Sequence, residues 1–314
     1  MGVSQIFEKM TVLPEVENQF VFKDDERNIE IFIKREDLIH PFVSGNKFRK
    51  LKYNLLQAKN ENQKTLLTFG GAFSNHIAAV AMAGKLERFK TIGIIRGDEL
   101  VARIDENPTL KFAKENGMQL EFVSREAYSN KTNVDFLQAL KVKFGNFYLI
   151  PEGGTNPFAV KGCEEILRPE DAVFDYVCCA VGTGGTISGI INSAHPNQKV
   201  LGFPALKGDF LQNEIRNFAG HDNWQLITDY HFGGYGKINE ELILFLNQFL
   251  QKTKILLDPV YTGKMVFGVM DLIRDNYFPR NSKILIIHTG GIQGISGMNQ
   301  LLEKKKLSKI NTDV

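Results

Sequence analysis

Short apolar runs alternate with amphipathic helical patterns along most of this 314-residue chain, and this alternation limits the folds that it can adopt. Each run ends in glycine or a polar loop, as in "TLLTFGG" before "SNHIAAVAMAGKL" and "FDYVCCAVGTGG" before "TISGIINSA". Uninterrupted apolar runs are typical of strands that are buried on both faces of a parallel sheet and joined by crossover helices. Two such series follow one another, so the sequence predicts an α/β protein with two open, twisted, parallel-sheet units that share a cleft.

The composition is that of an ordinary globular protein and excludes several classes of function. The charge is balanced, with 38 Lys and Arg against 36 Asp and Glu, which argues against a nucleic-acid partner. No apolar run reaches the roughly 20 residues of a membrane span, so no membrane partner is expected. The N-terminal "MGVSQIFEKM" lacks the apolar centre of a signal peptide. We therefore expect a cytoplasmic location.

The three cysteines, Cys163, Cys178 and Cys179, agree with a reducing compartment. Cys178 and Cys179 are adjacent within an apolar run, so we interpret them as small buried strand residues. The chain has no CxxC pair and no His/Cys cluster, and no metal site is expected.

One lysine in "HPFVSGNKFRKLKYNLLQAK" stands apart from its neighbours. From Phe48 onward the apolar residues recur at helical spacing, and we interpret Lys50, Lys52 and Lys59 as solvated lysines of an amphipathic helix. Lys47 comes just before that stripe, behind "SGN", where a cap or turn is expected. It is either an ordinary first-turn lysine or an amine that the backbone presents to a reaction.

Four glycine-marked loops follow predicted strands, at the carboxyl ends where open α/β sheets bind their ligands. In "VGTGGTISG", Gly182, Gly184 and Gly185 allow a ligand to approach the backbone, while Thr183 and Thr186 add hydroxyl donors at a helix start. The loop matches neither a P-loop nor the dinucleotide motif GxGxxG. These residues favour a phosphate site, and a structural turn is the alternative.

The other three loops carry weaker signals. In "GGAFSNH", Ser74 or Asn75 can cap a helix, and a helix start with free N–H groups also binds an anion such as a carboxylate. The loops "PEGGTNP" and "HTGG" can each be plain turns between a strand and a helix. A site for one phosphate together with one unusually placed lysine suggests pyridoxal 5'-phosphate, whose aldehyde condenses with a lysine amine.

The motifs, taken in order, resemble those of one known family. The segments "KREDL", "SGNKFRKL", "GGAFSNH", "PEGGT", "GTGGT", "DPVYTGK" and "HTGG" occur as in the D-cysteine desulfhydrase and 1-aminocyclopropane-1-carboxylate (ACC) deaminase family. The resemblance implies a pyridoxal-phosphate enzyme of the tryptophan synthase β-like fold (fold type II) and a homodimer. It also implies a large cofactor domain of residues 1–51 and 161–314 and a small α/β domain of residues 52–160, with the active site between them.

The resemblance also implies roles for the residues that bind the cofactor. Lys47 matches the Schiff-base lysine, and Asn75 matches the asparagine that hydrogen-bonds the cofactor's 3′-oxygen. The phosphate loop corresponds to Gly182, Thr183, Gly184, Gly185 and Thr186.

On the substrate side, Ser74 and His76 match residues that hold the substrate carboxylate or assist proton transfer, next to Asn75. Tyr235 in "GGYGK" and Tyr261 in "DPVYTGK" resemble the two active-site tyrosines. Lys47, Ser74 and these tyrosines are therefore the expected catalytic residues.

Two positions separate the two activities of the family. ACC deaminases have glutamate after the second tyrosine and leucine before the last Gly-Gly, whereas this chain has Thr262 and Thr289, as the D-cysteine desulfhydrases do. A carboxylate would keep the pyridine nitrogen protonated, whereas a hydroxyl leaves it largely neutral. Opening a cyclopropane needs the stronger electron sink, so the threonines favour β-elimination. Residues 292–300 depart from the family pattern in a segment expected to border the substrate.

We therefore predict a β-eliminating lyase that converts D-cysteine into pyruvate, sulfide and ammonia, with Lys47 as the base on the α-proton. ACC deaminase is the nearest alternative, and a β-replacing synthase or a racemase of the same fold is another. The alternative from a different class is a non-catalytic phosphate- or nucleotide-binding module in which Lys47 is a plain surface cation.

Overall fold

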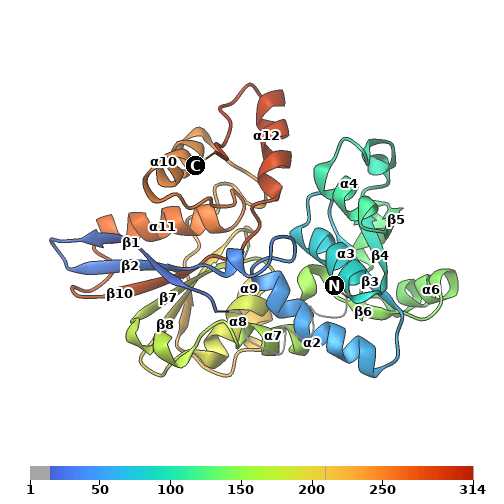
Figure 1. The fold of residues 1–314 in the computed structure, drawn as a ribbon, viewed down its shortest axis with the longest axis horizontal. Helices are drawn as coiled ribbons and strands as arrows, with labels where there is room; N and C mark the ends of the chain where they lie inside the picture. Colours follow the sequence, from blue (N-terminus) through green and yellow to red (C-terminus); the bar gives the residue numbers. More distant parts are fainter. Residues whose placement is uncertain (1–14, 209, 314) are drawn as a thin grey trace.

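The computed structural model describes residues 15–208 and 210–313, and its two sheets lie at opposite ends of the molecule with α2 (Asn46–Asn60) between them (Figure 1). The larger sheet has the order β1-β2-β10-β7-β8-β9, and the smaller has the order β5-β4-β3-β6. All strand pairs are parallel except β1 with β2 at one edge. The two predicted parallel-sheet units are therefore confirmed, with one antiparallel edge strand added.

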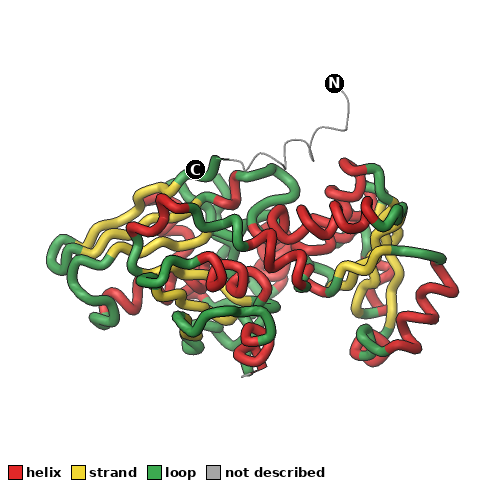
Figure 2. The backbone as a smooth tube through the Cα atoms, turned by 90° about the horizontal axis from the view of Figure 1, so that it is seen from below, coloured by secondary structure: helices red, strands yellow, loops and turns green. Residues whose placement is uncertain are grey.

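The larger sheet consists of β1 (Asn18–Asp24), β2 (Ile29–Lys34), β7 (Tyr176–Val181), β8 (Lys199–Pro204), β9 (Trp224–Leu226) and β10 (Lys283–Ile287). The smaller sheet consists of β3 (Thr65–Gly70), β4 (Lys90–Arg96), β5 (Met118–Val123) and β6 (Tyr148–Ile150). Figure 2 shows helices between the two sheets and along their faces. The early predicted strand "IEIFIK" is β2, and it pairs with the closing strand β10 from the other end of the chain.

Helices cover both sheets, as the alternating pattern predicts. Around the smaller sheet lie α3 (Asn75–Glu87), α4 (Pro108–Glu115), α5 (Arg125–Ser129) and α6 (Val134–Phe144). The remaining helices are α7 (Pro157–Cys163), α8 (Gly185–Ser193), α9 (Phe210–Arg216), α10 (Glu240–Thr253), α11 (Thr262–Arg274) and α12 (Gly294–Lys304). Short 3-10 turns lie at Glu36–Leu38, Asp98–Arg103, Glu152–Gly154 and Pro169–Val173. Within the described ranges, no helix is long and apolar enough to span a bilayer.

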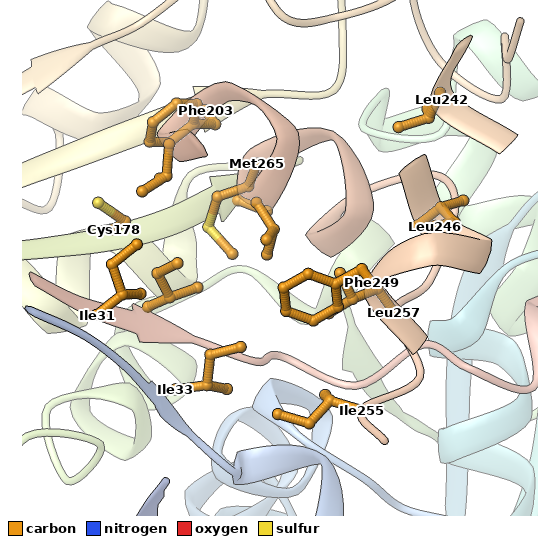
Figure 3. Close-up of a cluster of buried hydrophobic side chains, with 14 of the residues drawn as sticks. Ile31, Ile33, Cys178, Phe203, Leu242, Leu246, Phe249, Ile255, Leu257 and Met265 are labelled. Carbon is orange, nitrogen blue, oxygen red and sulfur yellow. The ribbon is translucent and has the colours of Figure 1, made fainter. Parts of the chain in front are cut away.

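The larger sheet is buried on both faces, which explains its uninterrupted apolar strands. On one face, Ile31 and Phe203 pack with Met265 of α11 in a cluster that also includes α10 (Figure 3). Cys178 belongs to this cluster, whereas its neighbour Cys179 belongs to the cluster on the opposite face. Both thiols are fully buried, so the interpretation of the pair as strand residues is confirmed.

The predicted domain boundaries fall inside helices. The boundary at residues 51 and 52 lies within α2, and the one at residues 160 and 161 lies within α7, which packs against α2. Both boundaries therefore fall within one pair of packed helices, and the division of the chain into residues 52–160 and the rest stays a prediction.

Candidate active site

A pocket lies where segments that follow strands of both sheets meet the first turn of α2. It spans about 660 Å³, part of which is open to solvent. The segments after β3, β6, β7 and β10 contribute Asn75, Gly153, residues 182–184 and residues 289–291, respectively. All four glycine-marked loops of the sequence therefore reach one cavity at the carboxyl ends of the strands, where parallel sheets bind ligands.

Lys47 lines this pocket from the first turn of α2, as its place before the apolar stripe predicts. Its Nζ lies 3.4 Å from Asn46 Oδ1. Burial, and then the charge of the neighbouring Lys50, lowers the pKa of Lys47 from 10.5 to about 7. A large part of the Lys47 population is therefore neutral near pH 7, as a nucleophile or general base requires.

The predicted phosphate loop connects β7 to α8 and borders the same pocket. Gly182, Thr183, Gly184 and Thr186 line the cavity, whereas Gly185 does not. The hydroxyl of Thr183 lies 2.6 Å from that of Thr155, and Thr186 Oγ1 accepts a 2.8 Å hydrogen bond from Asn46 Nδ2. The loop is thus tied to both α2 and the segment after β6, and the first turn of α8 is directed at the cavity.

Lys50 also lines the pocket, which the sequence interpretation missed. The interpretation of Lys50 and Lys52 as solvated was wrong: the two residues are only 2% and 7% exposed, because α2 packs against α7, α3 and the turn at Glu152–Gly154. Lys59, near the end of α2, is exposed as expected. Lys50 lies three residues after Lys47, and residues at this spacing share one helix face. That spacing was the available signal.

The ammonium of Lys50 is held by neutral oxygens alone. Its Nζ donates to Gly153 O at 3.0 Å and to Thr155 Oγ1 at 3.1 Å. Among the residues that the structure describes, no carboxylate forms an ion pair with it, whereas Lys52 pairs with Glu165 and Lys59 with Glu87. Burial lowers the pKa of Lys50 accordingly. A buried cation without a counter-ion is unfavourable, so this position suits an anionic ligand.

The three residues of "SNH" point in different directions. Ser74 caps α3, since its Oγ accepts a hydrogen bond from the Ile77 N–H at 3.3 Å, and Asn75 lines the pocket.

His76 does not line the pocket. Its Nε2 lies 2.8 Å from Thr68 Oγ1, and the Thr68 hydroxyl donates to the backbone oxygen of Ile150. The structure therefore places His76 behind the pocket wall, and its predicted contact with substrate stays a prediction.

His76 is neutral in this environment. Burial, followed by the charges of Lys47 and Lys50, lowers the pKa of His76 well below its ordinary value. Because the only hydroxyl proton of Thr68 goes to Ile150, Nε2 of His76 carries the ring proton. Its buried Nδ1 has no hydrogen-bond partner in the described part of the chain.

The two predicted tyrosines form a pair at the pocket. Tyr261 lines the cavity, and the ring of Tyr235 meets it edge-on with the centroids 6.0 Å apart. Tyr235 itself is 45% exposed and is not a lining residue. Burial raises the pKa of both phenols, so both stay protonated near neutral pH. The buried Lys264 holds the loop before Tyr235, because its Nζ donates to His231 O and Gly234 O, both at 2.9 Å.

The two threonines that bear on specificity occupy different environments. Thr289 lines the pocket two residues after the end of β10. Thr262 is fully buried at the start of α11, where its Oγ1 lies 3.0 Å from the Asp258 N–H and 3.4 Å from the Asp258 carboxylate. The structure thus brings Thr289 to the cavity, whereas the side chain of Thr262 is held by Asp258 in the turn before α11. The predicted contact of Thr262 with the cofactor stays a prediction.

The cavity fits pyridoxal phosphate in three respects. The glycine-rich backbone of residues 182–184 and the start of α8 offer N–H donors to a phosphate, and the buried Lys50 supplies the positive charge. Lys47 supplies an amine for the aldehyde. None of the described lining residues is Asp or Glu, so nothing among them repels a phosphate dianion.

Comparison with known proteins agrees with this fit. A family model described as "Pyridoxal-phosphate dependent enzyme" matches residues 19–290. The chain belongs to this family of enzymes. The pyridoxal-phosphate cofactor predicted from the loops and the lysine is thereby confirmed.

The enzyme's relatives carry the two activities that its motifs suggest. It is 32% identical over 295 residues to the mitochondrial bifunctional D-cysteine desulfhydrase/1-aminocyclopropane-1-carboxylate deaminase of Arabidopsis thaliana, which covers 85% of this chain and 73% of that one. A D-cysteine desulfhydrase of Klebsiella pneumoniae is 31% identical over 300 residues, with 85% of this chain and 88% of the other covered. These matches confirm the predicted D-cysteine desulfhydrase/ACC deaminase family.

A solved structure supports the fold assignment. The crystal structure of an ACC deaminase homologue has a TM-score of 0.77 and 28% sequence identity, and the match covers 95% of this chain and 98% of that one. Fold type II is therefore confirmed for this enzyme. At this level of identity the family is shared, whereas the substrate is a separate question.

Proposed function

We propose that this enzyme is a β-eliminating lyase for a small amino acid, with D-cysteine as its substrate. The observation that carries the proposal is the set of groups around the pocket, which includes Thr289 and, among the described lining residues, no carboxylate. Bound there, pyridoxal phosphate would supply an electron sink for the α-carbon of an amino acid. Without an ionised partner for its ring nitrogen the sink is moderate, which suits loss of sulfide better than ring opening.

The residues of the chain supply the remaining functions. Lys47 Nζ would hold the cofactor at its aldehyde carbon and, once released, take the proton from the substrate α-carbon. Lys50 and residues 182–186 would hold the phosphate, and the helix start at Ser74 and Asn75 would hold the substrate carboxylate. The protonated phenols of Tyr261 and Tyr235 would donate to the leaving sulfur. The overall reaction consumes D-cysteine and one water and yields pyruvate, hydrogen sulfide and ammonia.

An assay of keto-acid release over D-cysteine, L-cysteine and ACC tests this proposal. We expect pyruvate and sulfide in equal amounts from D-cysteine, with much lower rates for the other two compounds. Formation of 2-oxobutanoate from ACC as the faster reaction would instead identify a deaminase. Sulfide incorporation with O-acetylserine would identify a β-replacing synthase, and loss of optical rotation without keto acid would identify a racemase.

Lys50 provides a test of the phosphate site that does not depend on the substrate. Replacing Lys50 by methionine removes a buried ammonium, so we expect affinity for pyridoxal phosphate to fall by roughly ten- to a hundredfold, the range for a hydrogen bond to a charged group. Absorbance titration of the apoprotein measures this affinity. The matched control is Lys59→Met, at an exposed position on the same helix. Equal affinities of the two variants would rule out a phosphate role for Lys50.

Two further features belong to the proposal. A homodimer is inferred from the family resemblance. A cytoplasmic location agrees with the three buried thiols, none of which forms a disulfide.

A further inference from the structure

The proposed function leaves one feature of the pocket without a role, namely the segment after "HTGG" that departs from the family pattern. Gln293 lies in this segment, immediately before α12, and is an exposed residue that lines the pocket. Its Nε2 donates a 3.1 Å hydrogen bond to Oδ1 of Asn75, 218 residues earlier in the chain. Asn75 begins α3, which packs on the smaller sheet, whereas Gln293 follows the last strand of the larger one. The bond therefore joins the two sides of the cleft.

The backbone around Gln293 allows the two sides to approach closely. A Cβ on Gly291 would lie 2.8 Å from Asn75 Nδ2 and 3.1 Å from an Asp258 carboxylate oxygen. On the next turn, a Cβ on Gly297 would lie 2.8 Å from the ring of Phe73. Larger residues at these two positions would push the start of α3 away from α12. The small residues of "GGIQGISG" therefore bring Gln293 within hydrogen-bond distance of Asn75.

The direction of this hydrogen bond determines what Asn75 offers to the pocket. A primary amide has one acceptor atom and one donor atom, and turning it over exchanges them. Gln293 donates to Oδ1, so Oδ1 is occupied and Nδ2 is left as the donor. Among the described residues, none accepts a hydrogen bond from Asn75 Nδ2, although Asn75 lines the pocket. The ring oxygen of pyridoxal phosphate is an acceptor that matches this donor.

We propose that Gln293 is a positioning residue that fixes the direction of the Asn75 amide, so that Asn75 presents N–H to the bound cofactor. This inference rests on the proposed function, because it requires pyridoxal phosphate in the pocket. Gln293 acts across the cleft, through Asn75. This role of Gln293 also gives a reason for the departure of residues 292–300 from the family pattern, because the segment supplies the residue that orients the Asn75 amide.

Two substitutions of similar size separate loss of the bond from its reversal. Gln293→Met removes the donor, and we expect the dissociation constant of pyridoxal phosphate to rise by roughly three- to tenfold, the range for one hydrogen bond. Gln293→Glu can only accept, so it turns the Asn75 amide over and presents Oδ1 to the cofactor oxygen. We expect a larger rise than for Gln293→Met. The control is Gln251→Met at an exposed position on α10.

The absorbance of the bound cofactor as a function of pH is a readout that a purely structural role would not change. The titrating proton lies between the ring oxygen of the cofactor and the nitrogen of Lys47. Without a hydrogen-bond donor to the ring oxygen, this proton is held more tightly, so the midpoint of the titration should move to higher pH in both Gln293 variants. In an Asn75→Ala background, Gln293→Met should have no further effect on affinity or midpoint. The same background isolates the part of the Gln293→Glu effect that comes from its added charge.

The outcomes distinguish this inference from the proposed function. If wild-type protein binds no pyridoxal phosphate, the proposed function fails. If wild-type protein binds it, but Gln293→Met and Gln293→Glu match Gln251→Met within twofold and share its pH midpoint, only the role of Gln293 fails. Equal losses with and without Asn75 would likewise overturn it. A pH shift that requires Asn75 would support it.

Discussion

Replacing Lys47 by alanine is expected to reduce kcat by roughly a hundred- to ten-thousandfold, the range for losing a positioned general base. Lys47 lies in the first turn of α2 with its amine at the pocket, and its pKa of about 7 makes it a base under ordinary conditions. Lys47→Arg should fail equally, because a guanidinium stays charged and cannot take a proton. Lys59→Ala is the matched control on the exposed end of the same helix.

The covalent role of Lys47 has its own measurement. Borohydride reduction of the holoenzyme, followed by peptide mass spectrometry, should find the cofactor mass on the peptide that contains Lys47, and Lys47→Ala should lack it. Full turnover by Lys47→Ala, or an adduct on another lysine of the wild-type enzyme, would sink the assignment.

The pH dependence of kcat reports on the same amine. An amine with a pKa of about 7 is mostly charged at lower pH, so kcat should fall as the pH drops through that value. Part of the lowering comes from the charge of Lys50. Lys50→Met removes that charge and so raises the pKa of Lys47, which should move the rising limb of the profile to higher pH. With Lys59→Met the limb should stay in place.

Gly45→Ala is expected to cause the largest loss of stability, lowering the free energy of unfolding by about 3–5 kcal/mol. Gly45 directly precedes α2 and has a φ of +59°, a backbone conformation that residues with a side chain rarely adopt. A Cβ at this position would also lie 2.0 Å from the backbone oxygen of Thr289. Alanine would therefore force α2 away from the segment after β10 and move Lys47 out of place.

A second glycine separates the effect of backbone strain from the effect of steric overlap between the new Cβ and the Thr289 backbone. Gly117 has a φ of +85°, and a Cβ there would have no atom within 4 Å. Gly117→Ala should therefore lower the free energy of unfolding through backbone strain alone, by about 1 kcal/mol. Urea denaturation followed by circular dichroism compares the two variants, and kcat shows whether Lys47 has moved. If both variants had the same midpoint, close contact between α2 and Thr289 would not matter for stability.

Much of the fold and part of the site could be predicted from local patterns. The strands "TLLTFG" and "YVCCAV" can be predicted because a strand buried on both faces needs no polar alternation. The structure places apolar clusters on both faces of each of these strands. The sequence analysis does not predict β1, with seven residues, or β9, with three. They lie at the two edges of the larger sheet, where pairing on one side leaves a weaker pattern.

Lys50 and His76 are two residues whose side-chain contacts local sequence patterns do not predict. Lys50 looks like a solvated helix lysine, yet its Nζ contacts Gly153, which lies 103 residues further along the chain. His76 follows Asn75 directly, but the turn of the helix directs it to Thr68 and away from the pocket. The spacing of Lys47 and Lys50 indicates only that they share a helix face. The partners of Lys50 and His76 cannot be obtained from spacing, because each lies on another element of the fold.

The sequence by itself determined the α/β architecture, the lysine at a helix start and the glycine-threonine loop, because short stretches of chain encode burial periodicity and backbone geometry. The tertiary structure alone decided that Lys50 is a buried cation of the pocket and that Gln293 meets Asn75 across the cleft. Both contacts join groups that are 103 and 218 residues apart in the chain and that only the folded chain brings together. Chain folding sets the charge and the hydrogen-bond direction at such contacts, and these in turn set the chemistry of the site.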